Sequence, residues 1–184
     1  LGAIDYALHC DRRPSLLVVT DIDDDRLARA RSIYTVEHAK EQGVELVDLD
    51  TALAEGDVIS VHMNLTADNK YFFTKETFAK MKKHPIFINE GRGEMVEEAA
   101  LKWALDEGII RGAGIDMLES EDPDLSKCVL IEDPPRKNLI INPHSGYWSD
   151  TSDYLVRKYS MENAMNYVNG NFDAVHDIRN GVRK

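Results

Sequence analysis

Short apolar runs along the chain alternate with stretches in which apolar residues recur every three or four positions. The runs predict buried strands, and the periodic stretches predict amphipathic helices. Strands are predicted at 16–20, 44–49, 58–61, 85–89, 112–116 and 139–141, and helices at 4–10, 25–42, 51–55, 74–81, around Leu101 up to Gly108, and at 149–169. This alternation predicts an α/β fold, a Rossmann-type doubly wound parallel sheet. A length of 184 residues fits one domain, 1–184.

The beginning of the chain departs from this pattern. It opens on helical spacing at Ile4, Ala7 and Leu8, with no strand and no glycine-rich loop before it. In a dinucleotide-binding domain that strand and loop come first and hold the pyrophosphate. We therefore expect a Rossmann-type sheet that lacks its first strand and its glycine-rich loop.

The last predicted helix carries apolar residues on one face. Met161, Ala164, Met165 and Val168 recur at helical spacing, and Gly170 follows as a C-cap. We expect this face to be buried.

Polar residues gather where the predicted strands end. They are Asp21, His62, the segment 89–92, Asp116 and His144. In a doubly wound sheet, ligands bind in the crevice outside the carboxyl ends of the strands. The sequence therefore predicts a binding site at this edge of the sheet.

Asp21 ends a predicted strand and opens a turn. An acid at this place in a dinucleotide-binding unit hydrogen-bonds the adenosine ribose hydroxyls and disfavours the extra phosphate of NADP. The alternative is that residues 21–25 are an acidic helix start that complements the helix dipole.

Arg92 stands between Gly91 and Gly93 directly after a strand. Glycines let the backbone approach a ligand, and a guanidinium can hold a carboxylate with two parallel hydrogen bonds. The alternative is an arginine on a tight turn that forms a structural ion pair. The position at a strand end favours the carboxylate site.

His144 follows the last predicted strand and is a candidate general acid or base. Such a histidine needs a carboxylate partner to fix its tautomer and raise its proton affinity. Glu121 is a candidate, but Glu119, Asp122 and Asp124 stand beside it, and composition does not choose between them. We interpret His62, the other strand-end histidine, as structural or supporting.

Composition narrows the classes of partner. The chain has 22 basic and 33 acidic residues and a net charge of −11. A surface this negative repels nucleic acid and anionic membranes, so neither is expected as a partner, and an acidic substrate needs local positive charge. Cys10 and Cys128 have no metal-ligand spacing, and we expect reduced, inert thiols. No apolar run has the length of a membrane span, so we expect a cytoplasmic protein.

Four motifs carry a family resemblance: DVISVHMNLT at 57–66, INEGRGEMVEEAAL at 88–101, GAGIDMLESE at 112–121 and NPHSG at 142–146. In order and spacing, over about residues 44–182, the chain resembles the NAD-binding and catalytic half of the D-isomer-specific 2-hydroxyacid dehydrogenases. The resemblance implies NAD-dependent interconversion of a small 2-oxo acid and a D-2-hydroxy acid. It also implies a homodimer, and residues 150–184 as a helix and tail returning to a separate substrate domain, which is expected to be absent.

The resemblance also implies a role for each site residue. Arg92 would hold the substrate carboxylate, His144 would donate a proton to the keto oxygen, and Glu121 would support the protonated histidine. The cofactor would be lined by Asp21, Met63, Asn64, Asn69, Glu90, Gly91, Arg92, Asp116, His144, Ser145 and Gly146. No metal site is expected.

The first third of the chain differs from the rest. Residues 1 to about 45 look more like the nucleotide-binding domain of zinc-type medium-chain alcohol and sugar-phosphate dehydrogenases, so a chimera joined near 43–50 is one hypothesis. Asn64 stands where the D-2-hydroxyacid family usually has proline. Two other functions stay open: a non-catalytic NAD-binding or inert chimeric scaffold, and a fragment of a zinc-type dehydrogenase.

Overall fold

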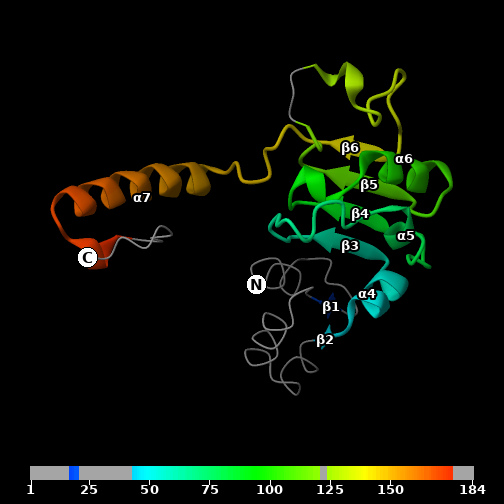
Figure 1. The fold of residues 1–184 in the computed structure, drawn as a ribbon, viewed down its shortest axis with the longest axis horizontal. Coiled ribbons are helices and arrows are strands. Elements are labelled where there is room, and N and C mark those ends of the chain that lie inside the picture. Colours follow the sequence, from blue (N-terminus) through cyan, green and yellow to red (C-terminus); the bar gives the residue numbers. More distant parts are fainter. Residues whose placement is uncertain (1–16, 21–42, 121–123, 176–184) are drawn as a thin grey trace. The chain divides into compact units, whose positions relative to one another are not determined.

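The computed structural model describes residues 17–20, 43–120 and 124–175 (Figure 1). The chain divides into two compact units, residues 1–143 and residues 144–184, and each is described by itself. The helices predicted at 4–10 and 25–42 lie outside the described residues, as do Asp21 and Glu121.

The described strands of the first unit are all parallel. They are β1 (Leu17–Val19), β2 (Val44–Leu46), β3 (Val58–Val61), β4 (Ile86–Asn89), β5 (Gly112–Ile115) and β6 (Leu139–Ile141). The strands β3-β4-β5-β6 form one sheet in that order, and β1 pairs with β2. Among the described strands, no pairing joins the two sheets. All the predicted strands are confirmed, most of them with shorter ends.

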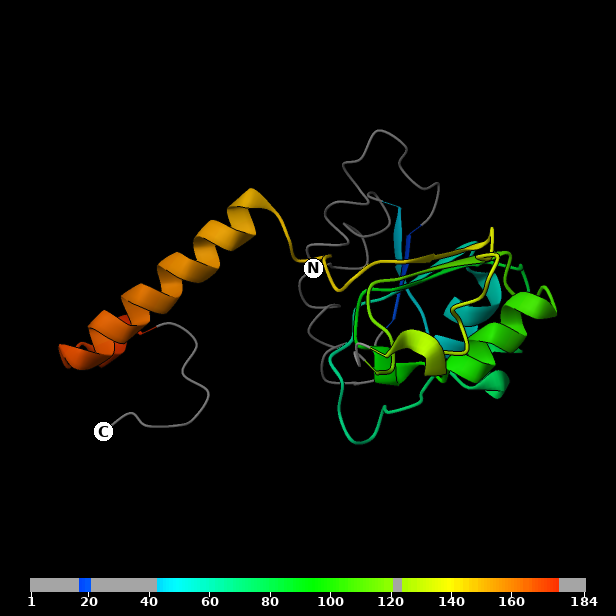
Figure 2. The ribbon, with the colours of Figure 1, turned by 90° about the horizontal axis from the view of Figure 1, so that it is seen from above.

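Three described helices lie on one face of the four-stranded sheet (Figure 2). They are α4 (Leu49–Glu55), α5 (Lys75–Phe78) and α6 (Glu98–Asp106), and short 3-10 turns follow at η1 (Gly93–Met95) and η2 (Leu125–Lys127). The side chain of Asp48 caps α4 by accepting a hydrogen bond from Thr51 N at 2.9 Å. Because parallel strands joined by helices all run the same way, their carboxyl ends meet at one edge of the sheet.

An aromatic cluster fills the space between this sheet and its helices. Phe87 on β4 contacts Phe73 and Phe78 edge-on, at centroid distances of 4.9 and 5.2 Å. Leu101 and Ala104 of α6 are buried beside them, as their helical spacing predicted. Burying one such large apolar side chain stabilises the fold by about 1.5–3 kcal/mol, so this cluster contributes substantially to holding the helices on the sheet.

The second unit consists of α7 (Asp150–Val168) and the 3-10 turn η3 (Phe172–Ala174). Ser149 Oγ caps α7 by accepting from Ser152 N at 3.1 Å. Ring contacts at 5.5 Å between Tyr167 and Phe172 join the two elements.

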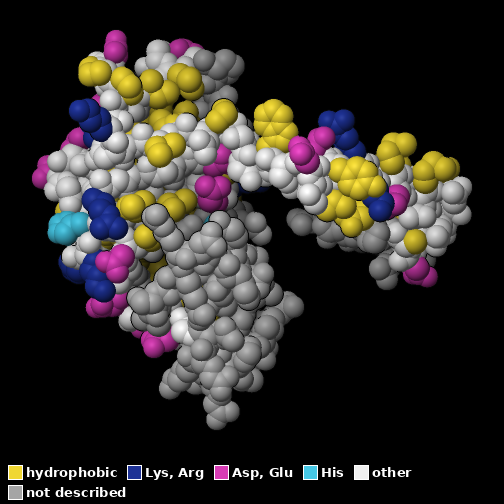
Figure 3. All heavy atoms as spheres, turned by 180° about the vertical axis from the view of Figure 1, so that it is seen from behind, with side chains coloured by type: hydrophobic (Ala, Val, Ile, Leu, Met, Phe, Trp, Pro, Cys, Tyr) yellow, Lys and Arg dark blue, Asp and Glu magenta, His cyan; other side chains and the backbone are white. Residues whose placement is uncertain are grey.

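The predicted buried face of α7 is wrong. Met161, Met165 and Val168 are 66%, 56% and 81% exposed, and Ala164 is exposed as well. The physical reason is that α7 packs within its unit against the one-turn η3, which is too short to cover a helical stripe. Figure 3 shows the resulting apolar side chains along the helix surface. None of the helices in the described ranges combines the length and apolar character needed to cross a membrane.

Candidate active site

The turn that carries Arg92 is closed by the side chain of Asn89, the last residue of β4. Asn89 is 1% exposed. Its Oδ1 accepts a hydrogen bond from Gly91 N at 3.0 Å, and its Nδ2 donates to Arg92 O at 3.0 Å. The buried amide therefore fixes both ends of the turn. The sequence pattern marked Asn89 as a strand-end polar residue but assigned it no role; an amide followed by glycine at a strand end was the available signal.

The two glycines beside Arg92 allow close contact between backbones. A Cβ on Gly91 would lie 2.9 Å from the carbonyl oxygen of Met63, and a Cβ on Gly93 would lie 1.8 Å from that of Leu118. The Arg92 turn is thus pressed between the segments that follow β3 and β5. These glycines are required by the chain's own packing, a reason that the sequence did not reveal.

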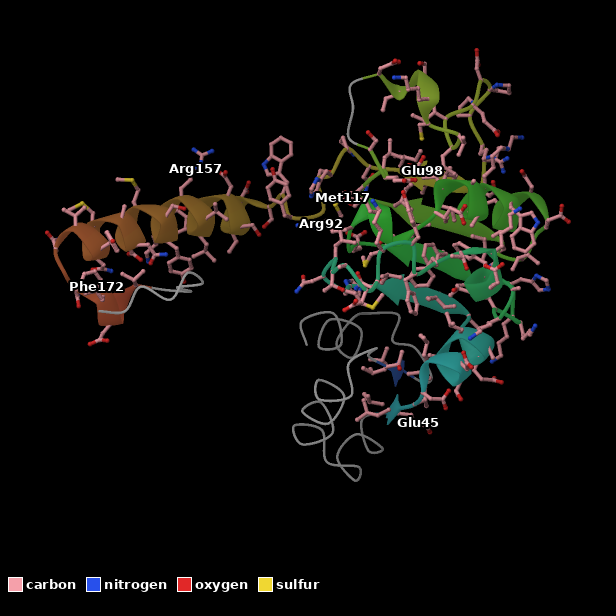
Figure 4. The ribbon with its side chains drawn as sticks, viewed as in Figure 1. Glu45, Arg92, Glu98, Met117, Arg157 and Phe172 are labelled. Carbon is pink, nitrogen blue, oxygen red and sulfur yellow. The ribbon has the colours of Figure 1, made fainter. Side chains whose placement is uncertain are left out.

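The guanidinium of Arg92 is exposed at the strand ends. Its Nη1 donates to Gly91 O at 3.1 Å and contacts Met117 Sδ at 3.8 Å, and Figure 4 shows Arg92 and Met117 side by side. Among the residues that the structure describes, Arg92 forms no ion pair. The structural ion pair considered above is therefore not seen in this part of the chain.

The loop after β3 carries Met63, Asn64 and Asn69. Asn69 is 2% exposed; its Oδ1 accepts from Thr66 N at 2.7 Å, and its Nδ2 donates to Asn64 O at 2.8 Å. Its amide is used to shape the loop, while Asn64 is exposed and Met63 half-buried. The contacts of these residues with a cofactor stay predictions.

The ends of β3, β4 and β5 are joined by backbone hydrogen bonds beyond the strands themselves. Glu90 N donates to Val61 O at 3.0 Å, and Asp116 N donates to Asn89 O at 3.1 Å. Asp116 is 3% exposed. The structure therefore brings Glu90, Gly91, Arg92 and Asp116 together at one edge of the sheet, as the strand-end pattern predicted, and Met63 lies beside Gly91 there.

His144 opens the second unit and has an unusual backbone. Its φ of +53° lies in the left-handed region, which residues other than glycine seldom adopt. Its ring stands perpendicular to that of Tyr147 at 6.3 Å, and Trp148 N donates to Ser145 O at 2.9 Å. A strained backbone of this kind is common at functional sites. The approach of His144, Ser145 and Gly146 to Arg92 stays a prediction.

Three predictions from the sequence remain: those on His62, on Cys128 and on metal binding. His62 Nε2 lies 2.8 Å from Ser60 Oγ on its own strand, which fits a structural or supporting role. Cys128 is a free thiol, and burial raises its pKa above the ordinary value. Within the described ranges, no three His, Cys, Asp or Glu side chains come together as a possible metal site.

Residues 25–146 match a family described as "D-isomer specific 2-hydroxyacid dehydrogenase, NAD binding domain". Among curated proteins, the chain is 39% identical over 125 residues to a glycerate dehydrogenase of Methylorubrum extorquens, covering 68% of this chain and 39% of that protein. It is 40% identical over 126 residues to a glyoxylate/hydroxypyruvate reductase B of Cronobacter sakazakii, covering 67% and 37%. The chain thus spans less than two fifths of the length of these relatives.

Solved structures agree with the fold. A D-lactate dehydrogenase with NAD+ from Lactobacillus jensenii has a TM-score of 0.65 at 30% identity, covering 84% of this chain and 46% of that one. A D-lactate dehydrogenase from Aquifex aeolicus, complexed with NAD and lactic acid, has a TM-score of 0.69 at 26% identity, covering 86% and 47%. The predicted Rossmann-type α/β fold is confirmed.

Proposed function

Because the chain belongs to the D-isomer-specific 2-hydroxyacid dehydrogenase family, we propose that its strand-end site serves NAD-dependent interconversion of a 2-oxo acid and a D-2-hydroxy acid. The observation that carries the proposal is the Arg92 guanidinium. It is exposed on a turn that the buried Asn89 amide fixes, at the edge of the sheet where ligands bind.

Arg92 binds the carboxylate of the 2-oxo acid in this proposal. A guanidinium stays protonated at any working pH, and its planar fork matches a carboxylate with two parallel hydrogen bonds. This local positive charge is needed because the protein carries a net charge of −11, which disfavours the approach of an anion. Orientation by two bonds also points the keto carbon in a fixed direction.

His144 donates a proton to the keto oxygen and takes it back in the reverse reaction. Glu121, which lies outside the described residues, supports the protonated form of the histidine. The support for this role is the left-handed backbone of His144, a kind of strain that is common at functional sites.

We assign the nicotinamide to the same edge of the sheet. Asp116 is nearly fully buried at the end of β5, and the loop shaped by Asn69 presents Asn64 to solvent. In our proposal bound NAD is lined by Met63, Asn64, Asn69, Glu90, Gly91, Arg92, Asp116, His144, Ser145 and Gly146, and Asp21 binds its ribose. The nicotinamide supplies or accepts the hydride when bound.

The proposal extends to the organisation of the protein. Residues 1–184 form the dinucleotide-binding domain, 150–184 return as a helix and tail, and the substrate domain lies outside these residues. The support is the share of the relatives' length that the chain spans, 39% and 37%.

We also propose a homodimer, from the family resemblance, and a cytoplasmic location, from the low cysteine content. The chimeric junction near 43–50 stays a prediction.

The test measures NADH binding by calorimetry and NADH oxidation with a panel of 2-oxo acids. Turnover by the parent and its loss in His144→Ala, with NADH binding kept, would support the proposal. His84→Ala, at an exposed histidine outside the strand-end site, is the matched control and should stay active. Binding without turnover would favour the non-catalytic NAD-binding alternative. No binding at all would leave the inert scaffold.

A further inference from the structure

The segment that follows β5 is held by side chains from two other elements. Glu119 N donates a hydrogen bond to Glu98 Oε1 at 2.8 Å, and Glu98 is the first residue of α6. The Tyr71 hydroxyl, from the loop after β3, donates to Glu119 Oε1. Glu119 is therefore held at its backbone by α6 and at its carboxylate by the β3 loop.

Tyr71 is itself firmly placed. Its φ of +52° lies in the left-handed region, and its backbone N donates to Glu94 O at 2.8 Å in η1. Lys70 Nζ stands 5.0 Å from the centre of its ring. A tyrosine keeps such a backbone when its surroundings determine it. The hydrogen bond to Glu119 raises the pKa of the Tyr71 hydroxyl above its ordinary value, so the hydroxyl stays a donor at neutral pH.

Residues 117–119, which the two hydrogen bonds to Glu119 hold in place, lie against the Arg92 turn. The carbonyl oxygen of Leu118 would be 1.8 Å from a Cβ on Gly93, and Met117 Sδ is 3.8 Å from the Arg92 guanidinium. Residues 117–119 thus form one wall of the turn that carries Arg92. Because the Leu118 backbone leaves no room beside Gly93, we expect a shift of this wall to displace the Arg92 turn.

We propose that Tyr71 and Glu98 are positioning residues for Arg92, acting through the two hydrogen bonds that they make with Glu119. Glu98 fixes where the 117–119 wall stands relative to α6, and Tyr71 ties the same wall to the loop after β3. Their effect on substrate binding rests on the proposed function of Arg92. The stabilisation of residues 117–119 by these hydrogen bonds does not depend on the proposed function.

Tyr71→Phe removes the hydroxyl, and with it the hydrogen bond to Glu119, but keeps the aromatic ring. We expect the KM for the 2-oxo acid to rise on the order of tenfold, because small displacements of a substrate-positioning group weaken carboxylate binding. The affinity for NADH should stay unchanged. Tyr154→Phe on α7 removes the hydroxyl of another exposed tyrosine and is the matched control. An unchanged KM in Tyr71→Phe, in an active parent, would overturn the positioning role.

A double-mutant cycle separates the hydrogen bond from general damage. Glu119→Leu removes the acceptor, and combining it with Tyr71→Phe should add nothing further to the KM. Glu119→Gln keeps an acceptor oxygen and should restore much of the parent value. Strictly additive effects of Tyr71→Phe and Glu119→Leu would contradict a shared action.

Hydrogen–deuterium exchange of the peptide that covers 112–120 tests whether these hydrogen bonds stabilise the segment, and it does not require enzymatic activity. Exchange should be faster in Tyr71→Phe and in Glu98→Leu, which removes the acceptor of Glu119 N, than in the parent, and unchanged in Tyr154→Phe. Parent-like exchange in both variants would overturn the inference. A parent without turnover but with this exchange pattern would contradict the proposed function and support the hold.

Discussion

The side-chain amide of Asn89 and the backbone carbonyl of Arg92 are joined by a 3.0 Å hydrogen bond that closes the turn at the end of β4. The same amide accepts from Gly91 N, so one buried side chain determines the turn conformation. The placement of Arg92 therefore depends on the buried side chain of Asn89.

Asn89→Ala should lower both stability and substrate affinity. The substitution leaves Gly91 N and Arg92 O without their partner, which costs about 1–3 kcal/mol of unfolding free energy. Urea unfolding measures this loss. Asn138→Ala, at an exposed asparagine before β6, should change stability by less than about 0.5 kcal/mol. Equal stability of the two variants would contradict the role given to the amide.

Gly93→Ala and Gly114→Ala form a matched pair. A methyl group on Gly93 would meet the Leu118 backbone, which cannot move aside as a flexible side chain can. A methyl group on Gly114 would have none of the described residues within 4 Å. We expect Gly93→Ala to destabilise the fold by roughly 1–3 kcal/mol. Gly114→Ala should be neutral or stabilise slightly, by roughly 0.4–1 kcal/mol. Thermal unfolding of both variants is the measurement, and the reverse order would refute the close packing of the Arg92 turn.

An ion-pair network predicts a dependence of stability on pH. Arg136 contacts Asp106 of α6 and also Glu132, and Lys102 Nζ lies 2.7 Å from Glu132 Oε1. The hydrogen bond from Arg136 lowers the pKa of Asp106 below its ordinary 3.8, and the bond from Lys102 lowers that of Glu132 below 4.5. A carboxyl group with a lowered folded pKa stabilises the fold above its unfolded pKa and loses this contribution as the pH falls.

Arg136→Gln should therefore be less stable than the parent at pH 7, and the difference should shrink as the pH falls below about 4. Urea unfolding of both proteins across this range measures it. Lys158→Gln, at an exposed lysine of α7, is the control and should show no such convergence. A constant difference at every pH would show that packing of Arg136, and not its charge, supports the fold.

The sequence predicted the strands because each is a continuous apolar run bounded by turn residues, as 58–61 and 139–141 show. It also predicted which polar residues meet at one sheet edge, since parallel strands align their carboxyl ends. It failed on α7, where the spacing of Met161 and Met165 reveals an apolar face but not whether anything covers it. It could not assign Glu119 either, because neighbouring acids look alike until Tyr71 and Glu98 are seen to contact one of them.

Arg92→Lys tests whether binding of the substrate carboxylate needs the two parallel hydrogen bonds of a guanidinium or only a positive charge. Lysine keeps the charge but offers a single point of attachment, and it loses the bond to Gly91 O that holds the guanidinium against its own turn. We expect the KM for the 2-oxo acid to rise by about 10- to 100-fold, corresponding to roughly 1.4–2.8 kcal/mol of lost transition-state binding. The affinity for NADH should change much less, because the nicotinamide site is supported mainly by other residues. Steady-state kinetics and calorimetry measure the two quantities. Arg157→Lys on α7, where the guanidinium pairs with Asp153 of its own helix, should leave both unchanged. If Arg92→Lys kept the parent KM, charge alone would suffice, and the geometric argument for the turn would lose its functional meaning.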